Sequence, residues 1–299
     1  MRFLRKNLCI MLAVLLACAG HPAVSAKAEG RNGIENVVPK GNGYYTCTFD
    51  GVSHGFIVDL PENAEGSPLI LMLPGYGGTA ESFRLETQFE KEANPLGYTV
   101  VYVTGAPDPA DKTSAVGWNS GIGQSEKQDV AFLVSLAEYL QQCYRLDSSR
   151  TYAAGFSNGA FMVHRLALEA GDTFSAAVSV AGTVSESVWA ARPAACSVSL
   201  LQITGEKDDV VPKKSDSSFR YAQSPAIEDV ISYYAEGLEL QETRPVGKGS
   251  VLAEYGSSLS GRHVWHLMVK EGRHSWPGER VTGVATNRFI LEFLESLAG

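Results

Sequence analysis

The sequence predicts an α/β protein with a mostly parallel central sheet, helices on both faces of the sheet, and an antiparallel hairpin near the N-terminus. Continuously apolar segments such as PLILMLPG (68–75) and YTVVYVTGA (98–106) are typical of strands that are buried on both faces. Segments with apolar residues at helical spacing separate these strands, which indicates crossover connections. Asp50-Gly51, between two apolar runs, predicts the hairpin.

The remaining elements repeat this alternation along the chain. After the hairpin over 44–60, the expected strands are 68–75, 98–106, 150–157, 174–182, 196–206 and 263–272. The expected helices are 81–94, 125–144, 158–171, 226–237 and 285–298. Because no repeat, low-complexity tract or linker interrupts the pattern, residues 27–299 are expected to form one catalytic domain.

The first 26 residues have the features of a secretory signal peptide. A basic start, MRFLRKN, precedes the apolar run LCIMLAVLLACA, and a small-x-small pattern ends at Ala26, where we expect cleavage and export. The alternative is lipoprotein processing at Cys18, because LLAC places small and aliphatic residues before that cysteine. No later segment is long and apolar enough to cross a membrane.

The charge and the cysteines restrict the partners of the chain. The full chain has a formal charge of −8, and removing the three basic residues of the signal gives 22 basic against 33 acidic residues, or −11. This charge argues against a nucleic-acid partner. Cys47, Cys143 and Cys196 remain after cleavage, and two of them could pair in an exported protein. Their spacing fits no metal-site pattern, so no metal ion is expected.

A serine lies between two glycines in GFSNG (155–159), which is the single G-x-S-x-G of the chain. It stands between an expected strand and an expected helix, as the nucleophile elbow requires. In such a turn the glycines permit close backbone packing, and the helix that starts at Asn158 directs its N–H groups toward an anion. Ser157 is therefore the candidate nucleophile, and a turn serine without catalytic function is the alternative.

A serine nucleophile needs an imidazole base, and in this fold the order along the chain is serine, acid, histidine. That order eliminates His54. His164 lies within the helix after the serine and is expected in the core or on the surface, whereas His263 and His266 lie inside a strand. His274 comes in the loop after the last strand, where a base is needed.

The acid and the oxyanion donors are expected in two other loops that follow strands. Asp208 and Asp209 both follow the strand LLQITGE, and the residues alone leave open which of them orients the imidazole. The turn PGYGG (74–78) follows a buried strand, so the backbone N–H of Tyr76 joins that of Asn158 as a candidate for the oxyanion hole.

These segments together resemble the polyhydroxybutyrate depolymerase and feruloyl or acetylxylan esterase group of the α/β-hydrolases, the esterases similar to carbohydrate esterase family one. The segments that carry the resemblance are PGYGG, KQDVAFL, GFSNGAFM, DDVVP and EGRHSWPG. The family pattern D-x-V-V-P implies that Asp208, not Asp209, is the acid. Two positions depart from the family: Pro74 replaces a histidine and Arg273 replaces a glycine.

The resemblance implies a secreted serine carboxylesterase in which Ser157, His274 and Asp208 hydrolyse feruloyl, acetyl or short hydroxyalkanoate esters. It also implies that Trp118 and Trp276 line the substrate cleft, although core packing is an alternative for both. No cofactor is expected. The ester is expected on a polysaccharide or polyester, because the short segment after residue 182 leaves no room for a large lid. A serine peptidase of the same fold and a catalytically silent binding protein are the alternative functions.

Overall fold

A computed structural model describes residues 33–109, 112–123, 125–211, 213, 224–257 and 259–298. The expected signal peptide and Cys18 lie outside these described residues. Within the described part of the chain, no helix is long and apolar enough to span a membrane.

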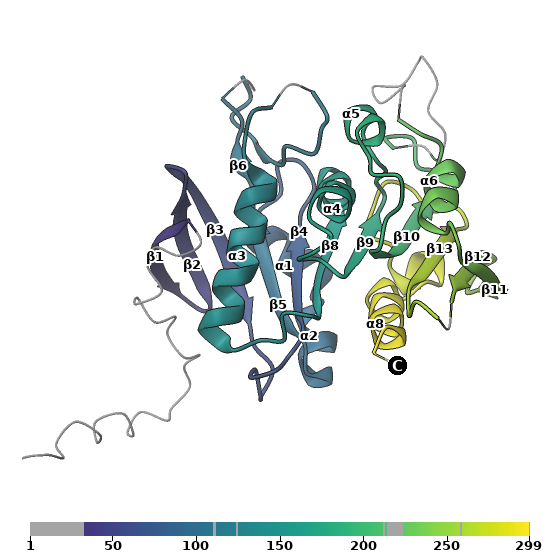
Figure 1. Ribbon diagram of the computed structural model, residues 1–299, viewed down its shortest axis with the longest axis horizontal. Helices are drawn as coiled ribbons and strands as arrows, with labels where there is room; N and C mark the ends of the chain where they lie inside the picture. Colours follow the sequence, from purple (N-terminus) through teal and green to yellow (C-terminus); the bar gives the residue numbers. More distant parts are fainter. Residues whose placement is uncertain are drawn as a thin grey trace, which may run out of the picture.

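Strands and helices alternate through the middle of the chain (Figure 1). The strands are β1 (Ile34–Gly41), β2 (Tyr44–Phe49), β3 (Val52–Asp59), β4 (Leu69–Leu73), β5 (Thr99–Thr104), β6 (Ala106–Pro107), β7 (Val116–Gly117), β8 (Thr151–Phe156), β9 (Ala176–Val180), β10 (Ser199–Gly205), β11 (Glu239–Val246), β12 (Ser250–Gly256) and β13 (His263–Val269). The α-helices are α1 (Ala80–Thr87), α2 (Glu90–Ala93), α3 (Asp129–Tyr144), α4 (Asn158–Glu169), α5 (Glu186–Ala190), α6 (Ile227–Tyr234), α7 (Glu279–Thr282) and α8 (Thr286–Ser296), and a 3₁₀ turn covers Asn94–Leu96.

The central sheet of the described residues has 11 strands in the order β1-β2-β3-β5-β4-β8-β9-β10-β13-β12-β11. The five pairings from β5 to β13 are parallel. The other five pairings, three on the β1 side and two on the β11 side, are antiparallel. The expectation of a mostly parallel sheet is therefore wrong, since the sheet as a whole is mixed.

The physical reason for this error lies at the two edges of the sheet. β1, β11 and β12 were not among the expected strands, and all three pair antiparallel. β1 and β11 are exposed along most of their length, so neither has the apolar pattern that marks a buried strand. The expected N-terminal hairpin is confirmed as β2 and β3, and its turn residues Asp50 and Gly51 both have positive φ.

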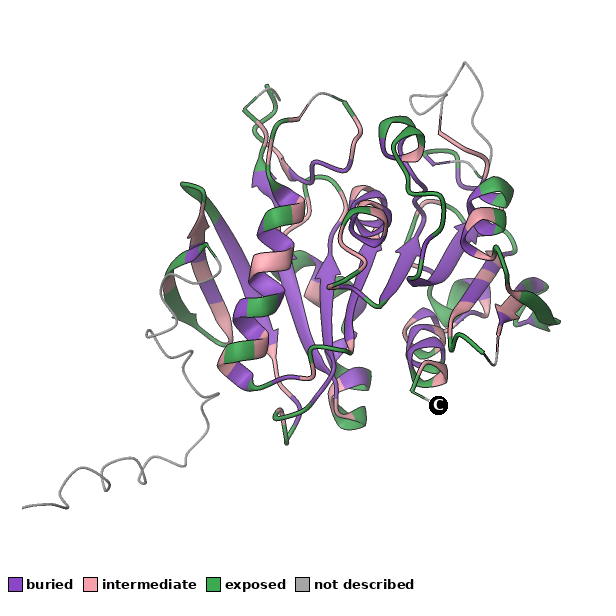
Figure 2. Cartoon of the chain, in the orientation of Figure 1, coloured by how far each residue is buried: buried purple, intermediate pink, exposed green. Residues whose placement is uncertain are grey.

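Two hydrophobic cores lie on opposite faces of the sheet, because alternate residues of the central strands belong to different cores. The central strands themselves are buried (Figure 2). Helices α3, α4 and α6 contribute to one core, and helices α1 and α8 contribute to the other. Strands β4, β9 and β10 are buried along their whole length, which the continuous apolar sequence of β4 and the mostly apolar sequences of β9 and β10 predict. Because these central strands are parallel, the loops after β4, β8, β10 and β13 all lie at the carboxyl ends of the strands.

Candidate active site

Three loops meet at the carboxyl ends of parallel strands and join a hydroxyl, an imidazole and a carboxylate. Ser157 follows β8, Asp208 follows β10, and His274 follows β13. The Nε2 atom of His274 lies 2.9 Å from the Oγ of Ser157, and its Nδ1 atom lies 2.9 Å from the Oδ2 of Asp208. The structure thus brings together the three residues that the sequence singles out.

The backbone of Ser157 has a conformation that residues other than glycine rarely adopt. Ser157 has φ 52° and ψ −118° immediately before α4. A Cβ atom on Gly155 would lie 2.3 Å from the carbonyl oxygen of Gly159, and one on Gly159 would lie 2.1 Å from that of Leu73. Both glycines are therefore required sterically, because strand and helix approach each other through bare backbone.

Asp208 is fixed by hydrogen bonds on both carboxylate oxygens. Its Oδ1 accepts the backbone N–H groups of Val210 and Val211 at 2.9 and 2.8 Å, and its side chain is fully buried. Asp209 is exposed. Of the two adjacent acids, the structure places Asp208 against the imidazole, as the family pattern implies.

His274 is oriented by the carboxylate and by an aromatic neighbour. A carboxylate at Nδ1 favours the tautomer with its proton on Nδ1, so that Nε2 is the acceptor for the Ser157 hydroxyl. The ring of Phe156 packs against the imidazole with centroids 5.0 Å apart. The imidazole is largely buried, with 16% of its side chain exposed, so the ring has little freedom to leave the serine.

The turn 74–78 lies close to the serine. A Cβ on Gly75 would lie 3.2 Å from the Cβ of Ser157, so glycine lets this turn approach the nucleophile. The Tyr76 ring faces Gly117, and its hydroxyl is 2.6 Å from the Oγ1 of Thr113. Asn158 is the first residue of α4, where a backbone N–H has no partner within the helix.

The side chain of Asn158 holds a neighbouring loop, a role that the sequence analysis did not assign to it. Its Oδ1 accepts the backbone N–H of Trp118 at 2.8 Å, and its Nδ2 donates to the Oγ of Ser120 at 2.9 Å. Loop 117–120 is therefore hydrogen-bonded to the side chain of the residue that follows Ser157. No sequence signal identifies this function, because the bonds depend on where a loop distant in sequence lies.

The two tryptophans that are candidates for the cleft wall both make hydrogen bonds within the fold. Trp118 is buried, and its Nε1 donates to the carbonyl of Pro74 at 3.0 Å, which ties two loops of the site together. Trp276 is half-buried, donates from Nε1 to Asn287, and packs edge-on against Phe83. These contacts favour the alternative of core packing for Trp118 and anchor Trp276 between α1 and α8.

The other histidines of the described residues lie in β3, α4 and β13, outside the three loops that meet at Ser157. His164 is fully buried and bonds Gln202 and Tyr234, and His266 lies in β13. The desolvation that accompanies burial lowers the pKa of His54, His164 and His266 to about 4 in each case.

The three cysteines are free thiols in the structure. The pairing of two of them, which export would permit, is thus not found. Burial raises the pKa of the Cys47 thiol to about 12. No group of three or more His, Cys, Asp or Glu side chains in the described residues is arranged to hold a metal ion.

A serine, a histidine and an acid joined in this order at the carboxyl ends of parallel strands define a hydrolase of the α/β-hydrolase type. The solved structure of an acetyl xylan esterase from Aspergillus awamori superimposes with a TM-score of 0.59, covering 81% of this chain and 94% of that one at 14% identity. At this identity the likeness shows the fold alone, which is the α/β-hydrolase fold.

Residues 54–233, more than half of the chain, match the family described as "Esterase PHB depolymerase", and the chain belongs to this family. "Putative esterase NocK" of Nocardia uniformis subsp. tsuyamanensis is 29% identical over 73% of this chain and 68% of its own length. Acetylxylan esterase A of Emericella nidulans is 27% identical over 43% of this chain, and the alignment spans 42% of that relative. The family resemblance is thereby confirmed, and the protein is a hydrolase that acts on ester bonds.

Proposed function

We propose that this chain is a secreted serine carboxylesterase that forms an acyl-enzyme on Ser157. The observation that supports it is the continuous hydrogen-bonded chain from Ser157 through His274 to Asp208, with both bonds at 2.9 Å. The Oγ of Ser157 attacks the ester carbonyl while the Nε2 of His274 accepts its proton. The carboxylate of Asp208 stabilises the imidazolium, which then protonates the leaving alcohol. Water then attacks the acyl-enzyme while His274 accepts its proton. His274 returns this proton to Ser157, and the acid is released.

The negative charge on the tetrahedral oxygen forms next to two backbone segments. The backbone N–H of Asn158 lies at the positive end of α4, where the helix dipole and the N–H direction both favour an anion. The backbone N–H of Tyr76 is the second donor, because the turn 74–78 approaches the serine through Gly75. Loss of one such donor typically lowers kcat about 100- to 1,000-fold.

The proposed substrates are acetyl, feruloyl or short hydroxyalkanoate esters of a larger alcohol. Acetylxylan and feruloyl esterases are among the relatives, although these alignments span less than half of those proteins. The acidic chain favours a neutral ester over an anionic polymer. A panel of methyl ferulate, acetylated xylan and hydroxybutyrate oligomers ranks the three classes by kcat/KM.

Covalent labelling tests the acyl-enzyme. An alkyl fluorophosphonate should label the wild-type protein once, and Ser157→Ala should abolish both labelling and hydrolysis of p-nitrophenyl acetate. Ser148→Ala, at an exposed serine just before the start of β8 and so at the opposite end of that strand from Ser157, is the matched control and should retain both. Labelling that survives in Ser157→Ala would place the nucleophile elsewhere.

Two further outcomes separate the alternatives. A protein that is folded but neither labelled nor active would be a binding protein, whereas cleavage of a proline-containing amide at a rate similar to that of the ester would indicate a peptidase. Export is tested by expressing the full chain and sequencing the N-terminus of the released protein, which should begin at Lys27.

A further inference from the structure

Lys127 is an almost fully buried lysine that contacts the backbone of the loop beside the candidate site. Its Nζ donates to the carbonyl oxygens of Ala106 and Gly117 at 2.8 and 2.5 Å, and it lies 3.3 Å from the carboxylate of Asp129. Its side chain is only 9% exposed. Burying an ammonium is costly unless it is paired and hydrogen-bonded, so this arrangement fixes Lys127 firmly in place.

Asp129, the partner of Lys127 in this ion pair, also contacts the loop at Asn119. Its Oδ2 accepts the backbone N–H of Asn119 at 2.6 Å, and its side chain is 2% exposed. From the opposite side, Arg165 of α4 donates to the carbonyl of Asn119 at 2.7 Å. Residues 117 and 119 are thus held by charged side chains, and residues 118 and 120 by the side chain of Asn158.

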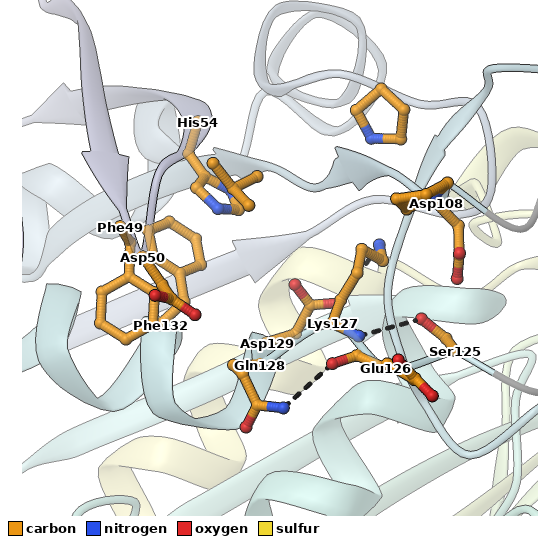
Figure 3. Close-up of a pocket in the computed structure, with 13 residues that line it drawn as sticks. Phe49, Asp50, His54, Asp108, Ser125, Glu126, Lys127, Gln128, Asp129 and Phe132 are labelled. Carbon is orange, nitrogen blue, oxygen red and sulfur yellow. Dashed lines mark hydrogen bonds and ion pairs between the residues drawn. The ribbon is translucent and has the colours of Figure 1, made fainter.

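Lys127 and Asp129 also border a cavity. Lys127 and Asp129 lie between Phe49 and Phe132 on one side and Asp108 on the other (Figure 3), in the wall of a cavity of about 770 Å³. Within the loop, Trp118 belongs to the apolar core, whereas Gly117 and Asn119 are bonded through their backbone to Lys127 and Asp129. The polar contacts of Lys127 and Asp129 therefore fix the loop backbone on both sides of the packed Trp118.

We propose that Lys127, together with Asp129, is a positioning residue for ester hydrolysis, which acts by fixing loop 117–120 against Asn158. A Cβ on Gly117 would lie 3.1 Å from the ring of Tyr76 and 3.2 Å from the Oδ1 of Asn158, so this loop touches both residues whose N–H groups are the proposed oxyanion donors. The inference rests on the proposed function, because it assigns a supporting role at the same site. An error of about 1 Å in such a group can cost about 100-fold in rate.

The double variant Lys127→Met/Asp129→Asn tests the proposal without leaving a buried charge unpaired. We expect kcat for p-nitrophenyl acetate to fall about 10- to 100-fold while KM changes less than about twofold, because the loop acts on the transition-state donors. Lys248→Met is the matched control, since Lys248 also donates to two backbone carbonyls, those of Arg280 and Val281, but far along the chain. It should leave kcat unchanged.

A double-mutant cycle with Asn158→Ala separates positioning from a general loss of stability. If both groups act through the same loop, combining Asn158→Ala with the double variant should cost no more than about threefold beyond the larger single effect. Multiplicative losses, or a folded double variant with wild-type kcat, would overturn the proposal. The labelling of Ser157 by fluorophosphonate distinguishes this outcome from failure of the proposed function, because the wild-type label would still depend on Ser157.

Discussion

The Nε2 atom of His274 lies 2.9 Å from the Oγ of Ser157, although 117 residues separate them in the sequence. The contact exists because β8 and β13 are parallel strands of one sheet with their carboxyl ends at the same edge. The sheet therefore sets the distance between the two side chains, and substitutions that leave the sheet intact test the proposed chemical role of one residue at a time.

The first of these roles is that of the acid. Asp208→Asn keeps an oxygen that can accept the N–H groups of Val210 and Val211, but it removes the negative charge and favours the wrong imidazole tautomer. We expect kcat to fall by about 10,000-fold, measured with p-nitrophenyl acetate. The matched variant Asp209→Asn changes an exposed side chain and should stay within about twofold. Equal losses in the two variants would contradict the assignment of Asp208.

A second experiment addresses Tyr76, whose proposed role belongs to its backbone. Tyr76→Phe removes the hydroxyl that lies 2.6 Å from Thr113 but keeps the N–H and the ring beside Gly117. We expect kcat/KM to remain within about threefold of wild type, since loss of one neutral hydrogen bond is worth about 1 kcal/mol or less here. A loss of 100-fold or more would transfer the role from the backbone to the phenol.

Gly159, two residues after Ser157, should be essential for the stability of the fold. In Gly159→Ala the new methyl group would meet the carbonyl oxygens of Leu73 and Pro74 at 2.1 and 2.6 Å, and a backbone cannot move aside as a flexible side chain does. We expect the free energy of unfolding in urea to fall by about 1–3 kcal/mol. Gly278→Ala, where nothing lies within 4 Å of the new Cβ, should be almost neutral.

Acid should destabilise the protein through its buried histidines. Burial lowers the pKa of His54, His164 and His266 to about 4, so below pH 6.5 the unfolded chain binds more protons than the folded one. The contribution of the neutral histidines to the free energy of unfolding is complete above pH 6.5 and is lost as the pH falls toward 4. The free energy of unfolding should change by up to about 1.4 kcal/mol per pH unit for each histidine. Urea unfolding between pH 7 and pH 4.5 measures it.

The variant His266→Phe isolates one of the three groups. It removes a buried imidazole whose Nε2 has no hydrogen-bond partner among the described residues. We expect a shallower dependence of the unfolding free energy on pH than in the wild type. An unchanged slope would mean that His266 titrates in the folded protein as it does in the unfolded chain.

The centre of the fold could be predicted because its strands are buried on both faces. β4 and β9 are fully buried and appear in the sequence as continuous apolar runs. β1 and β11 could not be found in this way, since an exposed edge strand needs no apolar alternation and is defined by backbone pairing with its neighbour.

The candidate site also has a part that the sequence predicts and a part that it does not. Ser157, Asp208 and His274 could be located because each follows a recognisable strand and carries a side chain suited to its proposed role. The supporting contacts of Asn158, Lys127 and Asp129 could not be, because they join side chains to backbone groups of a loop whose path depends on tertiary structure. For Trp118 the sequence leaves both the cleft and the core open, because burial is decided by packing, and in the structure the side chain is buried.

The exposed strand β11 has a consequence for the behaviour of the molecule in concentrated solution. Its sequence, ELQETRPV, places Pro245 near one end and acidic and basic side chains along an edge that no other described strand pairs with. Proline offers no N–H to an incoming strand, and charges on an edge discourage the stacking of sheets between molecules. This border of the sheet should therefore resist the strand pairing that leads to fibres.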